Sequence, residues 1–198
     1  MNMRRSVVRT KTLDPVSRRR GLKGGGLQGV GAEPVERTLP AGPQPMALGI
    51  ARRDGEYRVI AREPFDAGDV LLVVEGILVD NPSRYSVQVG VNLHVAPPPG
   101  LAPDDDSERY RWRYLNHSCR PNAAFRGRVL VALTSIARGE EIAFDYNTTE
   151  LDMASPFKCR CGHCGGRMIR GVRHLKGEER RRREPWLSEH IRIAVNAG

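Results

Sequence analysis

The stretch that decides the fold is RYLNHSCRPN, residues 113–122, together with a second stretch, GEEIAFDYN, at residues 139–147. Both stretches contain many hydrogen-bonding side chains between apolar residues. A simple surface turn would not need so many of them. A third motif, CRCGHC at residues 159–164, holds three of the four cysteines, and the fourth is Cys119 in the first stretch. We expect these three pieces to meet in space and to form one active site with a metal beside it.

The cysteine spacing predicts a zinc site. Cys159 and Cys161 cannot easily close a disulfide with each other, because neighbours in an extended chain point their side chains to opposite sides. Thiolates this close together repel unless a cation neutralises them, and zinc takes four such ligands in a tetrahedron. The fourth ligand would be Cys119 or a histidine, and His163 lies inside the loop itself. With Cys119 in place, the site is a structural zinc whose ligands are Cys119, Cys159, Cys161 and Cys164.

Positive charge is concentrated at the two ends of the chain. Residues 1–45 hold 9 basic and 3 acidic side chains, residues 165–198 hold 9 and 4, and residues 46–164 hold 14 and 16. The net charges are therefore +6, +5 and −2, which sum to the formal +9. Basic ends favour a polyanion such as nucleic acid as a neighbour, whereas a mildly acidic centre suits a basic peptide as substrate.

Length and hydrophobic periodicity predict one mostly-β domain with short helices. We expect strands at residues 57–61, 70–74, 76–79, 129–133 and 142–146, and a looser alternation of apolar residues over 83–95 favours strand as well. The acidic residues 104–106 indicate a loop or the exposed start of a helix. Residues 1–45 are rich in glycine, arginine and proline, which predicts a disordered segment.

No run of about 18 apolar residues is present, so a membrane span is not expected. The first 20 residues carry positive charge without the apolar centre of a secretory signal. Four cysteines, three of them within six residues, fit a reducing compartment and a metal better than a disulfide framework. We therefore expect an intracellular, non-secreted monomer in the cytoplasm or the nucleus.

The three motifs carry a resemblance. RYLNHSCxPN followed by GEEIxFDY resembles the two signatures of the SET-domain protein-lysine methyltransferases, and CxCx2CGGR resembles the cysteine-rich post-SET segment that follows them. The strand-turn-strand around FxAGDV at residues 65–70 is also similar to that family. The resemblance covers about residues 47–171. It divides the chain into a basic segment (1–45), a SET domain (46–147), a post-SET-like zinc segment (148–171) and a basic tail or docking helix (172–198).

The resemblance implies a fold of small β-sheets in which the first stretch is threaded through a loop, forming a pseudoknot. It implies S-adenosylmethionine as cofactor and methyl transfer to a lysine side-chain amine of a protein, histone-like or ribosomal. By similarity Tyr146 is the catalytic tyrosine, and Asn116 and His117 contact the cofactor, with Tyr114 supporting its pocket. Phe125 and Phe144 stand at positions similar to those that set the width of the lysine channel, together with Tyr146.

Two departures from the family pattern stand out. The usual Gly-x-Gly near the first strand is reduced to Gly55, followed by Tyr57 and Arg58, and Arg58 is a candidate to reach the carboxylate of the cofactor. The last cysteine gap is two residues where four are usual. The alternatives are a catalytically inactive SET-like module that binds a basic peptide or nucleic acid, and a small zinc-stabilised nucleic-acid binder that uses its basic termini.

Overall fold

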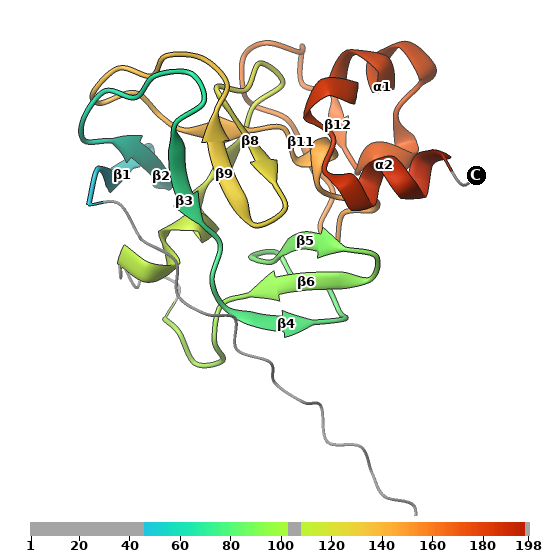
Figure 1. Cartoon of the computed structure of the whole chain (residues 1–198), viewed down its shortest axis with the longest axis horizontal. Helices are drawn as coiled ribbons and strands as arrows, with labels where there is room; N and C mark the ends of the chain where they lie inside the picture. Colours follow the sequence, from blue (N-terminus) through green and yellow to red (C-terminus); the bar gives the residue numbers. More distant parts are fainter. Residues whose placement is uncertain (1–45, 103–107, 197–198) are drawn as a thin grey trace, which may run out of the picture. The chain divides into compact units, whose positions relative to one another are not determined.

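The computed structural model describes residues 46–102 and 108–196. The expectations for residues 1–45 and 104–106 therefore lie outside the described residues. Within the described part, the strands form five small sheets, three of two strands and two of three strands (Figure 1). This arrangement agrees with the predicted mostly-β class with short helices.

The first sheet is a hairpin of β1 (Leu48–Arg53) and β2 (Glu56–Ala61), paired antiparallel. Asp54 and Gly55 connect the two strands with positive φ angles of 53° and 79°. Two successive positive φ angles are what a tight hairpin turn of the Asp-Gly type requires, because its twist matches that of the strands. The sequence analysis placed only the second strand, although the Asp-Gly pair was a signal for the first.

Two three-stranded antiparallel sheets make up most of the rest (Figure 1). In one, β9 (Val129–Ala132) lies between β3 (Val70–Val73) and β8 (Ala123–Arg126). In the other, β6 (Leu93–Ala96) lies between β4 (Ile77–Val79) and β5 (Val87–Gly90). The alternation over residues 83–95 is thus a hairpin, which reverses at Asn92 with φ of 51°.

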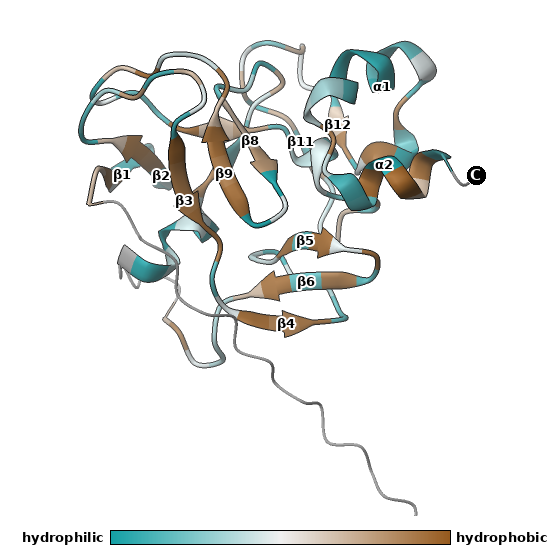
Figure 2. Ribbon diagram, in the orientation of Figure 1, coloured by the Kyte–Doolittle hydropathy of each residue, from teal (hydrophilic) through white to brown (hydrophobic). Residues whose placement is uncertain are grey.

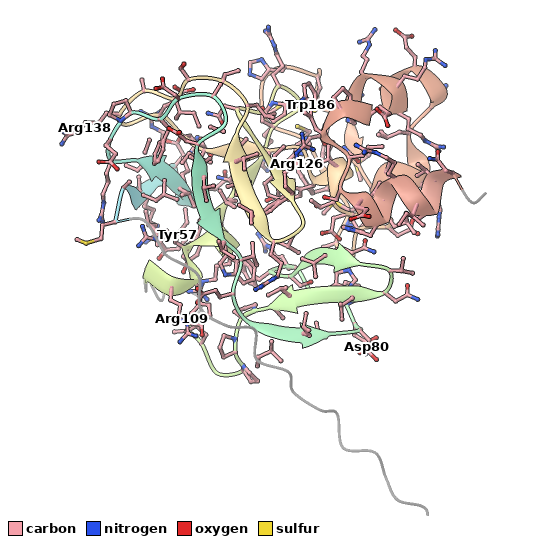
Figure 3. The ribbon with its side chains drawn as sticks, in the orientation of Figure 1. Tyr57, Asp80, Arg109, Arg126, Arg138 and Trp186 are labelled. Carbon is pink, nitrogen blue, oxygen red and sulfur yellow. The ribbon has the colours of Figure 1, made fainter. Side chains whose placement is uncertain are left out.

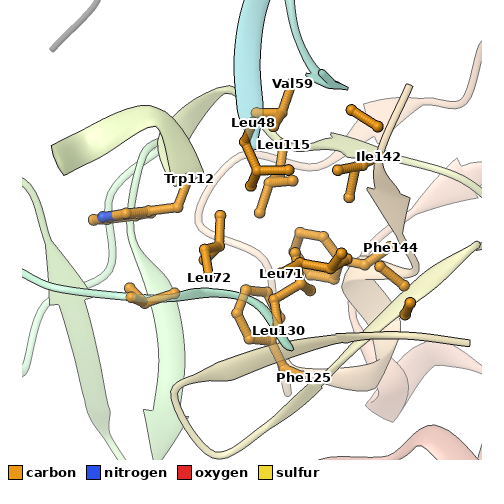
Figure 4. Close-up of a cluster of buried hydrophobic side chains, with 14 of the residues drawn as sticks. Leu48, Val59, Leu71, Leu72, Trp112, Leu115, Phe125, Leu130, Ile142 and Phe144 are labelled. Atoms are coloured by element: carbon orange, nitrogen blue, oxygen red, sulfur yellow. The ribbon is translucent and has the colours of Figure 1, made fainter. Parts of the chain in front are cut away.

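The main core lies where the first hairpin, the β3-β9-β8 sheet and the motif stretches face one another. Leu71, Leu72 and Leu130 are completely buried there, and Phe125 packs against them from the neighbouring strand (Figure 4). Burying each such side chain stabilises the fold by about 1.5–3 kcal/mol. Trp112, in the 3-10 helix η1 (Glu108–Tyr114), closes one end and donates its indole N–H to the carbonyl of Glu75 at 3.0 Å.

The two motif stretches are interleaved. β7 (Asn116–His117) pairs in parallel with β10 (Ala143–Phe144). Asn122 holds the two stretches together, because its side chain donates to the carbonyl of Glu141 and accepts from the N–H of Ala143. This interleaving is consistent with the pseudoknot that the resemblance implied. It shortens the strand expected at 142–146, which gives way to the 3-10 helix η2 (Tyr146–Thr148).

The C-terminal part is a compact helical unit. After the small sheet of β11 (Phe157–Lys158) and β12 (Met168–Ile169) come η3 (Val172–His174), α1 (Gly177–Arg183), η4 (Glu184–Trp186) and α2 (Glu189–Asn196). α1 is strongly hydrophilic, whereas α2 carries an apolar face (Figure 2).

The helical unit docks on the domain. Val172, Leu187 and Ile191 form a second apolar cluster, whereas Ile193 is 58% exposed. Of the two alternatives for residues 172–198, the structure shows docking, made by Leu187 and Ile191, while Trp186 on η4 is only half-buried (Figure 3). Within the described residues, every helix is too short or too polar to cross a bilayer.

Candidate active site and metal centre

A single large cavity of about 1530 Å³ is lined by residues from all three motifs. It exceeds the 300–1,000 Å³ of a usual small-molecule site, so it has room for a cofactor and part of a second reactant. The residues singled out from the sequence that line it are Gly55, Tyr57, Arg58, Tyr114, Asn116, His117, Phe144, Tyr146, Cys159, Cys161 and His163.

Tyr146 occupies the junction between the interleaved stretches. Its hydroxyl donates to the carbonyl of Leu115 at 2.6 Å. This hydrogen bond joins the second stretch to the first and fixes the position of the phenol. Burial, and then the negative charge of Glu150, raises the pKa of Tyr146 well above its usual value of 10. The hydroxyl therefore stays protonated and serves as a hydrogen-bonding group, not as a phenolate base.

His117 is held as a neutral imidazole with a defined tautomer. Its Nδ1 accepts the backbone N–H of Tyr146 at 3.2 Å, which leaves the ring proton on Nε2. Nε2 lies 3.2 Å from the sulfur of Cys119. Burial lowers the pKa of His117 to about 4, although the nearby carboxylate of Asp145 opposes that shift. The histidine thus joins the segment around Tyr146 to the cysteine cluster.

Asp145, directly before Tyr146, is held by a side chain that comes from outside the three motifs. Its Oδ1 accepts from the backbone and side chain of Asn147 at 3.0 and 2.8 Å, which caps η2. Its Oδ2 accepts from Nε of Arg183 at 2.6 Å, and the two side chains are only 2% and 8% exposed. Arg183 comes from α1, and the sequence analysis had not assigned it a role because only the fold brings it close.

Asn116 and Arg58 share a carboxylate at the other side of the cavity. Asn116 donates its amide to Oε1 of Glu141 at 2.9 Å and to the carbonyl of Tyr57 at 3.0 Å. Nη1 of Arg58 donates to Oε2 of Glu141 at 2.5 Å. Nε of Arg58 is buried and has no hydrogen-bond partner among the described residues. An unpaired buried donor is costly, so this nitrogen is ready to bind an anionic group.

Aromatic rings shape the cavity wall. Tyr57 and Tyr114 lie with ring centroids 4.7 Å apart, and Arg113 stacks on the Tyr114 ring. Tyr146 contacts Phe144 at 4.8 Å and Phe157 at 5.8 Å. Phe157 was not among the residues predicted from the sequence, and the only signal for it was its position two residues before Cys159.

Phe125 differs from its expected place. It is completely buried and meets Phe144 edge to face at 4.9 Å, without lining the cavity. It belongs to the hydrophobic core behind the cavity wall, so it acts on the channel only through Phe144. Phe144, Tyr146 and Phe157, by contrast, are aromatic residues that line the cavity.

The four cysteines meet as a tight cluster. Their sulfur atoms all lie within 4.8 Å of one another, with 3.9 Å between Cys119 and Cys159 and 4.0 Å between Cys161 and Cys164. Four zinc–sulfur bonds of about 2.3 Å in a tetrahedron place the sulfurs about 3.8 Å apart, so the cluster fits the metal. His163 is exposed and is not part of the cluster, which favours Cys119 as the fourth ligand.

The loop geometry explains how three ligands come from six residues. Gly162 and Gly165 adopt φ angles of 78° and 64°, a left-handed conformation that side chains with a Cβ disfavour. Burial and the neighbouring thiols raise the pKa of Cys119. A cation at the centre would reverse that effect, because it stabilises all four thiolates together.

Comparison with known proteins agrees with this geometry. Residues 56–147 match the family model described as SET domain. The chain is 35% identical over 85 residues to the methyltransferase flvH of Aspergillus flavus, a match that covers 40% of this chain and 46% of that protein. It is 38% identical over 64 residues to histone-lysine N-methyltransferase ASHH2 of Arabidopsis thaliana, covering 27% of this chain and 4% of that one.

Two further comparisons cover more of the chain. Human histone-lysine N-methyltransferase 2B is 27% identical over 131 residues, which is 59% of this chain and 5% of that protein. A crystal structure of KRYPTONITE in complex with mCHG DNA and SAH aligns with a TM-score of 0.46 and 20% identity, covering 61% of this chain and 28% of that one. The match thus spans less than half the length of each of these relatives. Residues 56–147 of this chain therefore match the SET domain family model, and the cysteine cluster that follows them fits a post-SET segment.

Proposed function

We propose that this protein transfers a methyl group from S-adenosylmethionine to a lysine side-chain amine of a protein. The observation that carries the proposal is the placement of Tyr146, Asn116 and His117 on one cavity that is large enough for both reactants. The SET domain and the names of the relatives as methyltransferases support the reaction class.

The residues of this chain supply binding, alignment and exclusion of water. When bound, S-adenosylmethionine supplies an electrophilic methyl group on a positively charged sulfur. The unpaired Nε of Arg58 would donate to its carboxylate, and the amide of Asn116, held by Glu141, would contact its amino-acid part. In the Gly-x-Gly pattern of the family, the second glycine lets the backbone come close to the cofactor. This chain lacks that glycine, and Arg58 would bind the cofactor instead.

The amine would enter between Tyr146 and the phenylalanine walls. Phe144 and Phe157 flank the tyrosine ring and keep water away from the reacting atoms. Holding amine and methyl group in line removes the entropic part of the barrier, worth up to roughly 7–11 kcal/mol in well-oriented systems. The Tyr146 hydroxyl, fixed on Leu115 and kept protonated, would orient the groups around the transferred methyl.

The cysteine cluster would hold a structural zinc with all four ligand positions filled. Its role is to attach the segment from Phe157 to Ile169 to the catalytic stretch through Cys119. Phe157 is then fixed against Tyr146, so that the metal shapes the channel without touching the reactants.

The test is a calorimetric titration of the purified chain with S-adenosylmethionine, with zinc determined on the same sample. We expect saturable binding and one zinc per chain. Tyr146→Phe should keep the affinity for the cofactor and lose transfer to core histones by at least about 100-fold. Tyr110→Phe is the matched control, because Tyr110 does not line the cavity and its substitution should leave the rate unchanged.

Absence of cofactor binding in zinc-loaded protein would refute the proposal and favour the inactive peptide-binding module. A basic peptide or nucleic acid as ligand would then be recognised by binding whose salt dependence is steep. Lysine-rich proteins such as histones are the first substrates to try, because two of the relatives are named histone-lysine N-methyltransferases. The monomeric state, the intracellular location and the division into four segments stay predictions.

A further inference from the structure

Glu150 is a buried carboxyl group on the wall of the cavity. It comes two residues after the end of η2, and its backbone N–H donates to the carbonyl of Tyr146 at 2.9 Å. The residue is 7% exposed and lines the same cavity as Tyr146. Its charge is close enough to the tyrosine ring to raise the pKa of the phenol. The proposed methyl transfer, as described above, assigns it no role.

The carboxyl group has hydrogen-bond donors beside it but no firm cationic partner. Its Oε1 accepts the backbone N–H of Gln88 at 2.9 Å, and Gln88 in turn accepts the N–H of Leu151 at 2.9 Å. Oε2 lies 3.8 Å from Nε2 of His94, beyond hydrogen-bond distance. Among the described residues, no lysine or arginine forms an ion pair with Glu150.

The two histidines beside Glu150 supply no positive charge, and Arg84, which lines the same cavity and acts on Tyr146, forms no ion pair with Glu150 among the described residues. His94 on β6 and His190 near the start of α2 are both buried, and burial lowers the pKa of each, so both are neutral. His190 is bound to the carbonyl of Thr149 at 2.8 Å. Tyr146 stays protonated, and the Thr149 side chain and the Gln88 N–H only partly offset burial, which raises the pKa of Glu150 to about 7.

Burying a carboxylate without a cation beside it lowers the stability of the folded protein. Groups that are unfavourable for stability in this way are frequent at functional sites. The proposed substrate brings a cation into this cavity, because a lysine amine with a pKa of about 10.4 arrives as ammonium. An ammonium cannot attack a methyl group until it has lost a proton. The cavity therefore contains an acceptor that lacks a cation, beside the tyrosine at which the ammonium must be deprotonated.

We propose that Glu150 binds the ammonium group of the substrate amine and accepts the proton that the amine loses before methylation. The carboxylate and the ammonium become a carboxylic acid and a neutral amine. The amine lone pair then forms the new carbon–nitrogen bond while the carbon–sulfur bond of the cofactor breaks, and the bond electrons stay on sulfur. Glu150 returns its proton to solvent before the next turnover. This inference rests on the proposed methyl transfer.

The first experiment measures ammonium binding without any turnover. Butylammonium is titrated by calorimetry into the zinc-loaded chain at pH 5.5 and pH 8.5, with S-adenosylhomocysteine present. The probe is charged at both values, whereas the carboxyl group of Glu150 is charged only at the higher one. We expect about tenfold tighter binding at pH 8.5, in line with a charge-assisted hydrogen bond.

Three variants separate this role from a structural one. Glu150→Gln keeps an oxygen for the Gln88 N–H but cannot be charged, so the pH dependence should vanish. Glu150→Asp should retain the pH dependence with weaker binding. Glu75→Gln is the matched control, since it removes a carboxyl group that is 1% exposed and lies outside the cavity lining, and the pH dependence should persist.

The second experiment follows transfer to core histones across pH. Glu150→Gln should bind S-adenosylmethionine within about twofold of the original protein but transfer at least about 100-fold more slowly at neutral pH, the usual loss for a general base. The rise in rate of the original protein near pH 7 should be absent from the variant. An unchanged rate and pH profile in Glu150→Gln would overturn the role of Glu150 as proton acceptor.

The two experiments distinguish failure of this inference from failure of the proposed function. A chain that binds butylammonium through Glu150 but not S-adenosylmethionine retains the amine site and refutes methyl transfer. A chain that binds S-adenosylmethionine, but binds butylammonium equally at both pH values or not at all, refutes the role of Glu150.

Discussion

Removing the side chain of Arg183 should destabilise the protein far more than removing its neighbour Arg182. Arg183 and Asp145 form an ion pair at 2.6 Å with side chains 8% and 2% exposed. Arg183→Ala leaves the carboxylate of Asp145 buried without its cation, which costs about 3–5 kcal/mol. Arg182 pairs with Glu178 on the exposed face of the same helix, an interaction worth about 0.3–0.5 kcal/mol.

Thermal unfolding of zinc-loaded samples measures the difference. For a domain of this size, each kcal/mol lowers the Tm by about 2–4 °C, so Arg183→Ala should lower it by roughly 6–20 °C. Arg182→Ala should change it by less than about 2 °C. Arg183→Lys keeps the charge and should recover part of the loss.

A local measurement locates the effect. Asp145 accepts the backbone N–H of Asn147, so loosening its carboxylate should speed hydrogen exchange at residues 145–149 more than in the β3-β9-β8 sheet. The reasoning is refuted if Arg183→Ala and Arg182→Ala unfold at the same temperature with the same exchange at residues 145–149. That result would mean that solvent reaches Asp145 and screens its charge.

Three further predictions concern the metal, one glycine and pH. Cys164→Ser should release zinc and lower the Tm by more than 10 °C, and one zinc per chain with an unchanged Tm would contradict the four-cysteine site. Gly171→Ala should cost about 3 kcal/mol, because its φ is 104° and a Cβ would lie 2.4 Å from the Leu151 carbonyl; Gly127→Ala, at φ 60° with open space, should cost about 1 kcal/mol in the same denaturation assay. Burial raises the pKa of Glu150 from 4.5 to about 7, so the folded state holds a proton that the unfolded state releases, and the contribution of Glu150 to stability should fall as pH rises between those values. The change in stability between pH 4.5 and pH 7.5, measured by urea unfolding, should be less negative in Glu150→Gln than in the original protein, and equal changes would show that Glu150 does not titrate there.

The sequence was most informative where chemistry is local. The cysteine spacing predicted the cluster, and the structure brings Cys119 to the other three. Short apolar runs located the strands around Leu71 and Leu130, because periodicity depends only on near neighbours. The mostly-β class followed from the same signals.

Contacts between residues that lie far apart in the sequence could not be predicted from local patterns. Arg183 looked like one of several basic residues in a tail, yet it meets a carboxylate 38 positions earlier. Glu150 looked like a polar residue after a motif, yet its carboxyl group meets a strand 62 positions earlier. The interleaving of the motif stretches was anticipated only from the family resemblance, because periodicity carries no information on threading.

The attachment of the helical unit to the catalytic segment has a consequence for synthesis in the cell. The N–H of Val172 binds the carbonyl of Glu150, the N–H of Ser188 binds that of Thr148, and His190 binds that of Thr149. The ribosome makes the chain from the N-terminus. The segment around Tyr146 is therefore made before its three partners and cannot form these hydrogen bonds until residue 190 has left the exit tunnel. The cavity around Tyr146 is thus completed only after the helical unit has been made, and until then the apolar strands that it will cover are exposed.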